Sequence, residues 1–162
     1  MNIQLKPFAE ENMPLFISWL TCDHVLPWYS PAKDWIEEVT KRNNEYDWIN
    51  HYIIYAESEP IGFCQYYTYW RSEEDWHGEL PTEGTYSIDY LIGDVRYLRK
   101  GCASKALTLL GEIIFSNDNA KRIIVQPEEE NRASCNTLLS AGYTYDQYNQ
   151  VYRLDRKPLQ IN

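Results

Sequence analysis

The stretch TYSIDYLIGDVRYLRKGCASKAL, residues 85–107, decides the fold of this chain. Residues 85–92 are typical of a β-strand, and the apolar spacing of a helix begins directly after Gly101. Small residues leave the start of that helix uncovered: Gly101, Cys102, Ala103 and Ser104. The first N–H groups of a helix lack intrahelical partners and carry partial positive charge. With Arg99 and Lys100 in front of it, the turn is predicted to bind a diphosphate.

A plain turn is the alternative interpretation of this stretch. Glycine-containing turns before helices are common, and Arg99 and Lys100 would then be solvated cations with no ligand. The rest of the sequence decides between the two.

Composition is that of one domain with its own core, since 162 residues need neither disulfides nor metal to fold. The 14 Tyr and 6 Trp have apolar bodies and polar tips, which suit a polar-lined cleft as well as a core. The net charge of −9 argues against nucleic acid and anionic membranes as partners, because both bind basic surfaces. The same charge permits a cationic substrate.

Cysteine and histidine spacing predicts neither a disulfide framework nor a metal site. No C-x-x-C pair occurs, so reduced thiols are expected at Cys22, Cys64, Cys102 and Cys135. The scattered histidines, His24, His51 and His77, lack metal-ligand spacing. The start MNIQLKPF has no apolar signal core and no run approaches membrane-spanning length, so we expect a cytoplasmic protein.

The order of elements predicts a mixed α/β sheet around the central strand–turn–helix unit. Apolar periodicity predicts helices over 10–20, 32–42, 102–115 and 131–142. Alternating or β-branched runs predict strands over 3–8, 85–92, 122–127 and 143–154, and a hairpin over 51–70. The connecting segments 21–31 and 71–84 are read as loops.

At this turn the chain resembles the GCN5-related N-acetyltransferases (GNAT). Their coenzyme motif, Q/R-x-x-G-x-G/A at a strand-to-helix junction, stands here as Leu98-Arg99-Lys100-Gly101-Cys102-Ala103. RIIVQPEEENRASCNTLLSAGY, residues 122–143, resembles the later family strand and the helix that ends in Ala-Gly-aromatic. The resemblance covers nearly the whole chain and implies one GNAT domain over 1–162.

Within the family the chain is most similar to aminoglycoside 6′-N-acetyltransferases. Three segments carry this likeness: WLTCDHVLPWYS (19–30), EPIGFCQYY (59–67) and SIDYLIGDVRYLRKGCASKAL (87–107). Related siderophore acyltransferases share much of the pattern, so the acceptor does not follow from the family.

The resemblance implies a strongly curved mixed sheet whose two central parallel strands splay apart, with flanking helices. Acetyl-CoA, the co-substrate, would lie in the splay, with its pantetheine along the strand and its pyrophosphate over the turn. The residues expected to contact it are Leu91, Ile92, Arg99, Lys100, Gly101, Cys102, Ala103, Ser104, Asn131 and Ser134.

Asp89 is the candidate catalytic residue. Aspartate is depleted in strand interiors, and transfer of an acetyl group to an amine needs a group that accepts the amine's proton. In the aminoglycoside enzymes the corresponding Asp is the proposed base. The alternative is a partly buried Asp bound to backbone donors or to a basic side chain. The acceptor is expected to contact Trp28, Tyr29, Tyr66, Glu79, Asp89 and Gln126.

Two positions depart from the family pattern. Gln126-Pro127 stands where the aminoglycoside enzymes usually have Asp-Pro, and glutamine cannot pair with a cation. Leu138 stands where many members have a Tyr that protonates the leaving thiolate. The acidic segment 71–84 is either a rim for a cationic substrate or a solvated loop.

The leading hypothesis is acetyl-CoA-dependent N-acetylation of a small cationic amine by direct transfer in a ternary complex. An aminoglycoside acceptor would make the protein an antibiotic-resistance enzyme. The alternatives are another amine (a polyamine, a siderophore precursor or a protein amine) and a non-catalytic acetyl-CoA-binding module. Monomer and homodimer are both compatible with the sequence.

Overall fold

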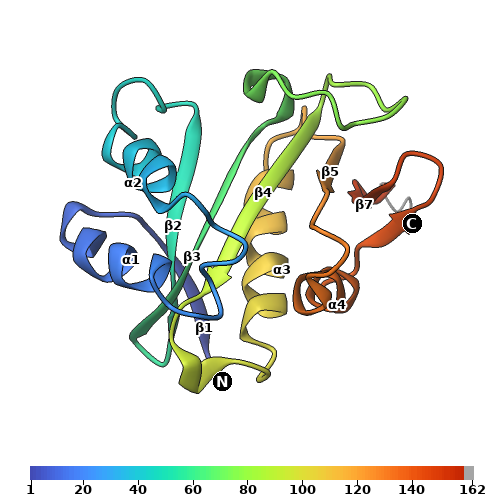
Figure 1. The fold of residues 1–162 in the computed structure, drawn as a ribbon. Helices are drawn as coiled ribbons and strands as arrows, with labels where there is room; N and C mark the ends of the chain where they lie inside the picture. The colour runs from blue at the N-terminus through green and yellow to red at the C-terminus, as the bar shows by residue number, and fades with distance from the viewer. Residues whose placement is uncertain (159–162) are drawn as a thin grey trace.

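The computed structural model describes residues 1–158 as a seven-stranded mixed sheet with helices on both faces (Figure 1). The strands are β1 (Ile3–Pro7), β2 (Ile49–Ala56), β3 (Glu59–Thr68), β4 (Thr85–Ile92), β5 (Arg122–Val125), β6 (Thr144–Asp146) and β7 (Val151–Asp155). The helices are α1 (Met13–Leu20), α2 (Ala32–Thr40), α3 (Cys102–Phe115) and α4 (Arg132–Ser140), with 3₁₀ turns η1 (Glu10–Asn12), η2 (Tyr69–Ser72) and η3 (Val95–Tyr97). The predicted fold class is confirmed.

The sheet opens between its two parallel strands. The strand order is β1-β2-β3-β4-β5-β7-β6, and only the neighbours β4 and β5 are parallel. They pair at Thr85 with Arg122 and at Tyr86 with Ile123 and then run apart (Figure 1). From Ser87 onward the edge of β4 that faces β5 therefore has no strand partner.

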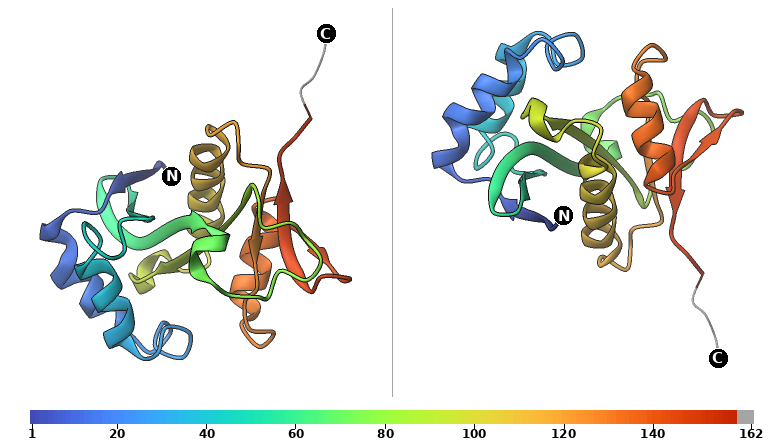
Figure 2. Two further views of the ribbon diagram at one scale, coloured as in Figure 1. Left: turned by 90° about the horizontal axis from the view of Figure 1, so that it is seen from above. Right: turned by 90° about the horizontal axis from the view of Figure 1, so that it is seen from below.

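Alternation of side chains along the strands assigns each residue to one of two cores. On one face, Phe63 and Leu91 pack with α1 and with Val39 of α2. On the opposite face, Cys64 and Ile92 pack with α3. Figure 2 shows α1 and α2 on one side of the sheet and α3 on the other. From Phe63 onward in β3, and along β4, odd-numbered residues thus face the α1–α2 layer.

The end of the chain differs from the sequence prediction. One strand over 143–154 was expected, but this is wrong: β6 and β7 form an antiparallel hairpin. The carboxylate of Asp146 accepts hydrogen bonds from the backbone N and from Nδ2 of Asn149, at 2.9 and 2.8 Å. This local closure, with Gln150 at φ 56°, turns the chain back.

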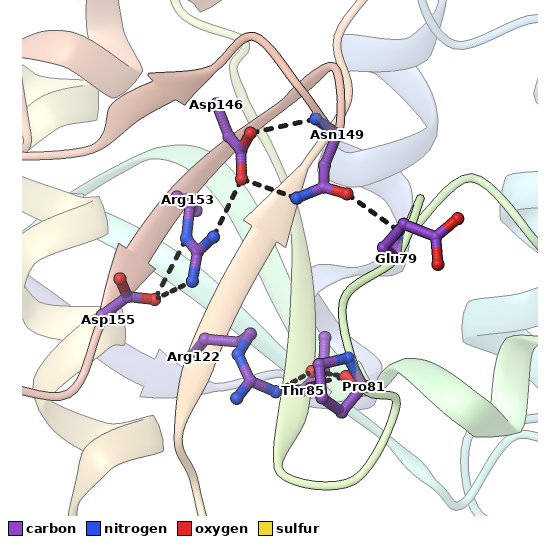
Figure 3. A network of polar contacts seen from close by, with 8 residues as sticks. All are labelled: Glu79, Pro81, Thr85, Arg122, Asp146, Asn149, Arg153 and Asp155. Atoms are coloured by element: carbon purple, nitrogen blue, oxygen red, sulfur yellow. Dashed lines mark hydrogen bonds and ion pairs between the residues drawn. The ribbon is translucent and has the colours of Figure 1, made fainter.

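A polar network joins this hairpin to the 71–84 segment (Figure 3). Oδ1 of Asn149 accepts a hydrogen bond from the backbone N of Glu79 at 2.8 Å, and Arg153 pairs with Asp146 at 2.8 Å. At the segment's other end, Arg122 donates to the carbonyl of Pro81 at 3.1 Å. The segment is therefore held in place although it has no regular structure after η2.

Gly93, directly after β4, permits close packing of α1 on the sheet. A Cβ at this position would lie 2.0 Å from Cγ of Trp19, which is buried. We expect Gly93→Ala to lower the free energy of unfolding by about 1–3 kcal/mol through overpacking. Urea denaturation measures the effect.

Gly111→Ala is the matched control. In α3 the added Cβ would meet its nearest atom, Cδ2 of Leu154, at 3.7 Å, so the alanine should raise stability by about 0.5–1 kcal/mol. Equal stabilities for the two variants would contradict the packing argument.

Candidate active site

A cleft of about 1230 Å³ lies where β4 and β5 separate. Its walls come from residues 87–92 of β4, the start of α3, α4, α2, the 21–31 segment and the segment that follows η2. Most of the residues predicted for a site fall within this one cavity.

The part of the cleft beside Gly101 is suited to binding an anion. Gly101 has φ 77°, a left-handed conformation that favours glycine, and α3 begins directly after it. No side chain caps the N-terminus of α3 among the described residues, so its first N–H groups are available. Arg99 lines the cleft beside them. Backbone donors, the helix dipole and the Arg99 side chain thus belong to the lining of the same cleft.

The N-terminus of α4 also lines the cleft. Oδ1 of Asn131 caps the helix by accepting from the backbone N of Ser134 at 3.2 Å. The Ser134 hydroxyl lies 2.5 Å from the Tyr90 hydroxyl, which reaches across from β4. Both predicted residues line the cleft, and their oxygens already have protein partners. The Asn131 amide remains able to donate.

The unpaired edge of β4 is partly covered by the 21–31 segment. The Tyr29 hydroxyl donates to the carbonyl of Tyr90 and accepts from the backbone N of Tyr90 at 3.2 Å. Nε2 of His24 donates to the carbonyl of Ile92 at 2.7 Å. Side chains thus satisfy backbone groups that a strand partner would otherwise satisfy.

The centre of the cleft contains two carboxylates that share one amide. Nε2 of Gln65 donates to Oδ2 of Asp89 at 2.9 Å and to Oε1 of Glu38 at 3.0 Å. Gln65 and Asp89 lie opposite each other in the β3–β4 ladder, and Glu38 comes from α2. All three line the cleft.

Both carboxylates have raised pKa values. Burial raises the pKa of Asp89 to about 6; the hydrogen bond from Gln65 opposes this shift, and the charges of Glu74 and Glu128 add to it. Burial likewise raises the pKa of Glu38 to about 7, against the same amide and with help from Asp89 and Glu74. At neutral pH, Asp89 is therefore mostly ionised and able to accept a proton.

The wall around these carboxylates is acidic and aromatic. Glu74 lines the cleft, and Nε1 of Trp76 donates to its Oε2 at 2.5 Å. The carboxylates lining the cavity are Asp34, Glu38, Glu74, Asp89 and Glu128. Aromatic neighbours include Trp28, Tyr29, Trp35, Trp48 and Tyr67. Arg99 is the one lysine or arginine among the described lining residues, so the charged side chains of this cavity are mostly negative.

Most predicted site residues line this cleft: Trp28, Tyr29, Asp89, Leu91, Ile92, Arg99, Gly101, Cys102, Ala103, Ser104, Gln126, Asn131 and Ser134. Gln126 also donates to the carbonyl of Gln150 at 3.0 Å, which leaves its Oε1 as an acceptor. Cys102 is buried, and its Sγ lies 3.5 Å from Sδ of Met1.

The structure places three predicted residues elsewhere. Tyr66 faces the α3 layer and packs between Tyr52 and Tyr86, because its position in β3 is even-numbered. Lys100 lies over the Tyr97 ring, with Nζ 5.9 Å from the ring centre.

Glu79 is the third residue outside the cleft. It is exposed, and its backbone N is bound to Asn149. Ser72, Glu74 and Trp76 are the members of its segment that face the cleft instead.

Glu38, Gln65 and Glu74 were not predicted as site residues from the sequence. Glu38 lies on an ordinary amphipathic helix with acidic neighbours, and nothing local marks it. A signal existed for Gln65, which is a polar residue inside an apolar strand within the segment EPIGFCQYY. Glu74 belongs to the acidic segment 71–84, which the sequence indicated only as a whole. Leu138, at the position of the missing Tyr, is fully buried.

Two findings concern other classes of function. In residues 1–158 no helix is both long and apolar enough to cross a membrane. Across the same residues no three His, Cys, Asp or Glu side chains gather so that they could hold a metal ion.

Relatives of this chain are acetyltransferases. Aminoglycoside N(6′)-acetyltransferase type 1 of Klebsiella pneumoniae is 24% identical over 148 residues, which span 88% of this chain and 74% of the relative. The crystal structure of aminoglycoside acetyltransferase AAC(6′)-Ib with coenzyme A superposes with a TM-score of 0.80 at 21% identity, covering 96% and 95% of the two chains. Aminoglycoside N(6′)-acetyltransferase from Legionella pneumophila gives 0.71 at 18% identity, covering 96% and 94%.

The family assignment rests on the sequence itself. Residues 9–151 match the family described as acetyltransferase (GNAT) domain, which is most of the chain. The match includes the starts of α3 and α4 and the strand that carries Asp89. The resemblance drawn from the sequence is confirmed: this protein belongs to the GNAT acetyltransferase family.

Proposed function

We propose that this protein transfers the acetyl group of acetyl-CoA to a primary amine of a small polycationic acceptor, an aminoglycoside bearing a 6′-amine. The separation of charge along one cleft carries the proposal. Arg99 and the N-terminus of α3 offer donors to an anion beside Gly101, while the charged groups that act on Asp89 are the carboxylates of Glu74 and Glu128. A cavity of this kind suits a polyanionic donor and a polycationic acceptor together.

For the coenzyme, the chain offers a backbone cradle and an unpaired strand edge. The N–H groups at the start of α3 and the Arg99 guanidinium are placed to hold the pyrophosphate. The pantetheine contains two amides, and an extended amide chain pairs with a free strand edge as an added strand does. At the edge of β4 near Leu91 and Ile92, such an amide chain would take the place of the His24 and Tyr29 side chains, which bond to the backbone of Ile92 and Tyr90.

For the acceptor, the carboxylates and aromatic rings match a polyamine. Ammonium groups pair with carboxylates, and the sugar rings of aminoglycosides present apolar faces that pack on Trp and Tyr. Relatives of this chain are named aminoglycoside N(6′)-acetyltransferases, and related crystal structures contain AAC(6′)-Ib with kanamycin or ribostamycin and coenzyme A. These names support an aminoglycoside over other amines.

Asp89 is the proposed base. The acceptor's ammonium group gives one proton to the Asp89 carboxylate, directly or through a water, and its nitrogen becomes a nucleophile. The nitrogen then bonds to the thioester carbonyl carbon and gives its second proton to water, the C–S bond breaks, and CoA leaves as the thiolate. Leu138 has no proton to give, so the thiolate takes one from water. Asp89 returns its proton to solvent, which completes the cycle.

A panel of amines tests the function. CoA release from acetyl-CoA, measured by chromatography, should be fast with aminoglycosides that carry a 6′-amine and slow with those that carry a 6′-hydroxyl. Turnover restricted to polyamines or hydroxylamines would assign a different acceptor. Binding of acetyl-CoA without turnover on any amine would identify the protein as a non-catalytic coenzyme-binding module and overturn the proposal.

Asp89→Asn should lower kcat by a factor of about 10²–10⁴, the usual contribution of general base catalysis. The affinity for acetyl-CoA, measured by calorimetry, should stay within about twofold, which also verifies folding. In the unsubstituted protein, kcat/KM should rise with pH through about 6, since only the ionised carboxylate accepts the proton. A variant with kcat near that of the parent would exclude Asp89 as the base.

Arg99→Ala should weaken acetyl-CoA binding about tenfold, or about 1.4 kcal/mol, because it removes the guanidinium beside the start of α3. Lys100→Ala is the matched control, since this neighbour carries the same charge but lies outside the cleft. Titration of each variant with acetyl-CoA by calorimetry separates the two positions. Equal losses would mean that general charge, and not placement in the cleft, governs binding.

A further inference from the structure

Two buried polar side chains in the middle of the sheet have atoms without hydrogen-bond partners. Among residues 1–158, neither ring nitrogen of His51 has a partner, and neither does Oε1 of Gln65. The residues are 7% and 1% exposed, respectively. Leaving buried donors and acceptors unpaired costs about 1–3 kcal/mol each, so their presence needs a reason.

The two side chains lie next to each other in line with the catalytic candidate. His51 of β2 is opposite Gln65 of β3, and Gln65 is opposite Asp89 of β4. All three face the α1–α2 layer, as Phe63 does, and the His51 ring stacks on Phe63 with 5.9 Å between ring centres. The line ends at the cleft.

Hydrogen-bond chemistry fixes the orientation of the Gln65 amide. Its nitrogen lies within 3.0 Å of two carboxylate oxygens, and carboxylates only accept, so the NH₂ group must face Glu38 and Asp89. Oε1 then faces away from the carboxylates and needs a donor. The imidazole of His51 can supply an N–H, and the Gln65 side chain raises the pKa of His51, as an acceptor does.

We propose that His51 and Gln65 are positioning residues that hold Glu38 beside Asp89, and that these two carboxylates form a joint binding site for the acceptor's ammonium groups. The roles of the carboxylates rest on the proposed function. One amide with two N–H donors overcomes the repulsion between two like charges and points both into the cleft. His51 keeps the amide from rotating, since rotation would turn Oε1 toward the carboxylates.

The groups that surround this pair set its titration. Those that face Asp89 and Glu38 are Gln65 of β3, Glu74 after η2, Glu128 after β5, and the phenols Tyr29, Tyr67 and Tyr90. Arg42 is the charged group that acts on His51, whose pKa burial lowers to about 4. His51 is therefore neutral across the working range, and one ring nitrogen carries a proton to donate.

Removal of the amide donors should disturb the pair without disturbing the coenzyme. Gln65→Leu should raise the KM for the acceptor about tenfold and leave the affinity for acetyl-CoA within about twofold. The rise of kcat/KM with pH, the acid limb of the pH profile, should move to higher pH in this variant. The reason is that the Gln65 hydrogen bond, which the variant lacks, lowers the pKa of both carboxyl groups. Glu38→Gln should raise the acceptor KM while kcat changes less than in Asp89→Asn.

His51 is tested with two variants and a control. His51→Phe keeps the ring against Phe63 but removes the donor, so it should shift the acid limb in the same direction as Gln65→Leu. His51→Gln retains an N–H donor, so the acid limb of its kcat/KM profile should lie closer to that of the unsubstituted protein than the limb of His51→Phe does. Tyr52→Phe is the control, since this neighbour in β2 faces the opposite layer and should leave the profile unchanged.

A measurement without substrate separates this inference from the proposed function. Carboxyl ¹³C shifts in labelled protein should titrate near 6 for Asp89 and near 7 for Glu38, and both midpoints should rise in Gln65→Leu and His51→Phe. Unmoved midpoints, or variants that lose only thermal stability, would overturn the positioning role. An unchanged acceptor KM in Glu38→Gln would overturn the joint site. If these variants shift the titration midpoints but the unsubstituted protein acetylates no amine, the proposed acetyltransferase function is refuted while the positioning role of His51 and Gln65 is retained.

Discussion

The parting of β4 from β5 after two residue pairs is the constraint on which the rest of the structure depends. Parallel strands that stayed paired would bury their edges against each other and leave no cavity. Once they separate, the edge of β4 needs other partners, and Tyr29 and His24 supply some of them. The same opening brings the start of α3 and the start of α4 into the lining of one cavity. The cleft, its anion-binding end near Gly101 and the lining formed by α4 thus all result from the separation of β4 and β5.

Ionisable groups in this cleft act against the stability of the fold. The pKa of Asp89 rises from its ordinary value of 3.8 to about 6, so the folded state holds the proton more tightly than the unfolded chain does. The resulting loss of stability is absent below pH 3.8, grows as the pH rises and is complete above about 6. Glu38, with a pKa of about 7, causes a similar loss of stability that is complete at a higher pH. The well-packed layers on both faces of the sheet offset this loss.

Local patterns predicted the strand–turn–helix unit, because its strand, glycine turn and small-residue helix start occupy one continuous stretch. Asp89 was found for a similar reason, as a charge inside a strand. Tyr66 was misplaced because alternation says that neighbours face opposite ways but does not say which face meets the cleft. Glu38 and Glu74 were not singled out because α2 and the segment after η2 reach Asp89 only through tertiary contacts. The final hairpin depended on side-chain bonds of Asp146 and Asn149, which periodicity does not report.

The clamp between Asn149 and the backbone of Glu79 has a consequence for how such a protein diversifies. It ties the segment carrying Glu74 and Trp76 to the last hairpin, and neither element belongs to the wall around Gly101. Insertions or replacements in these two surface elements can therefore reshape the acidic wall while the start of α3 stays as it is. A lineage can exchange one acceptor for another by changing peripheral segments and inherit its donor chemistry unaltered.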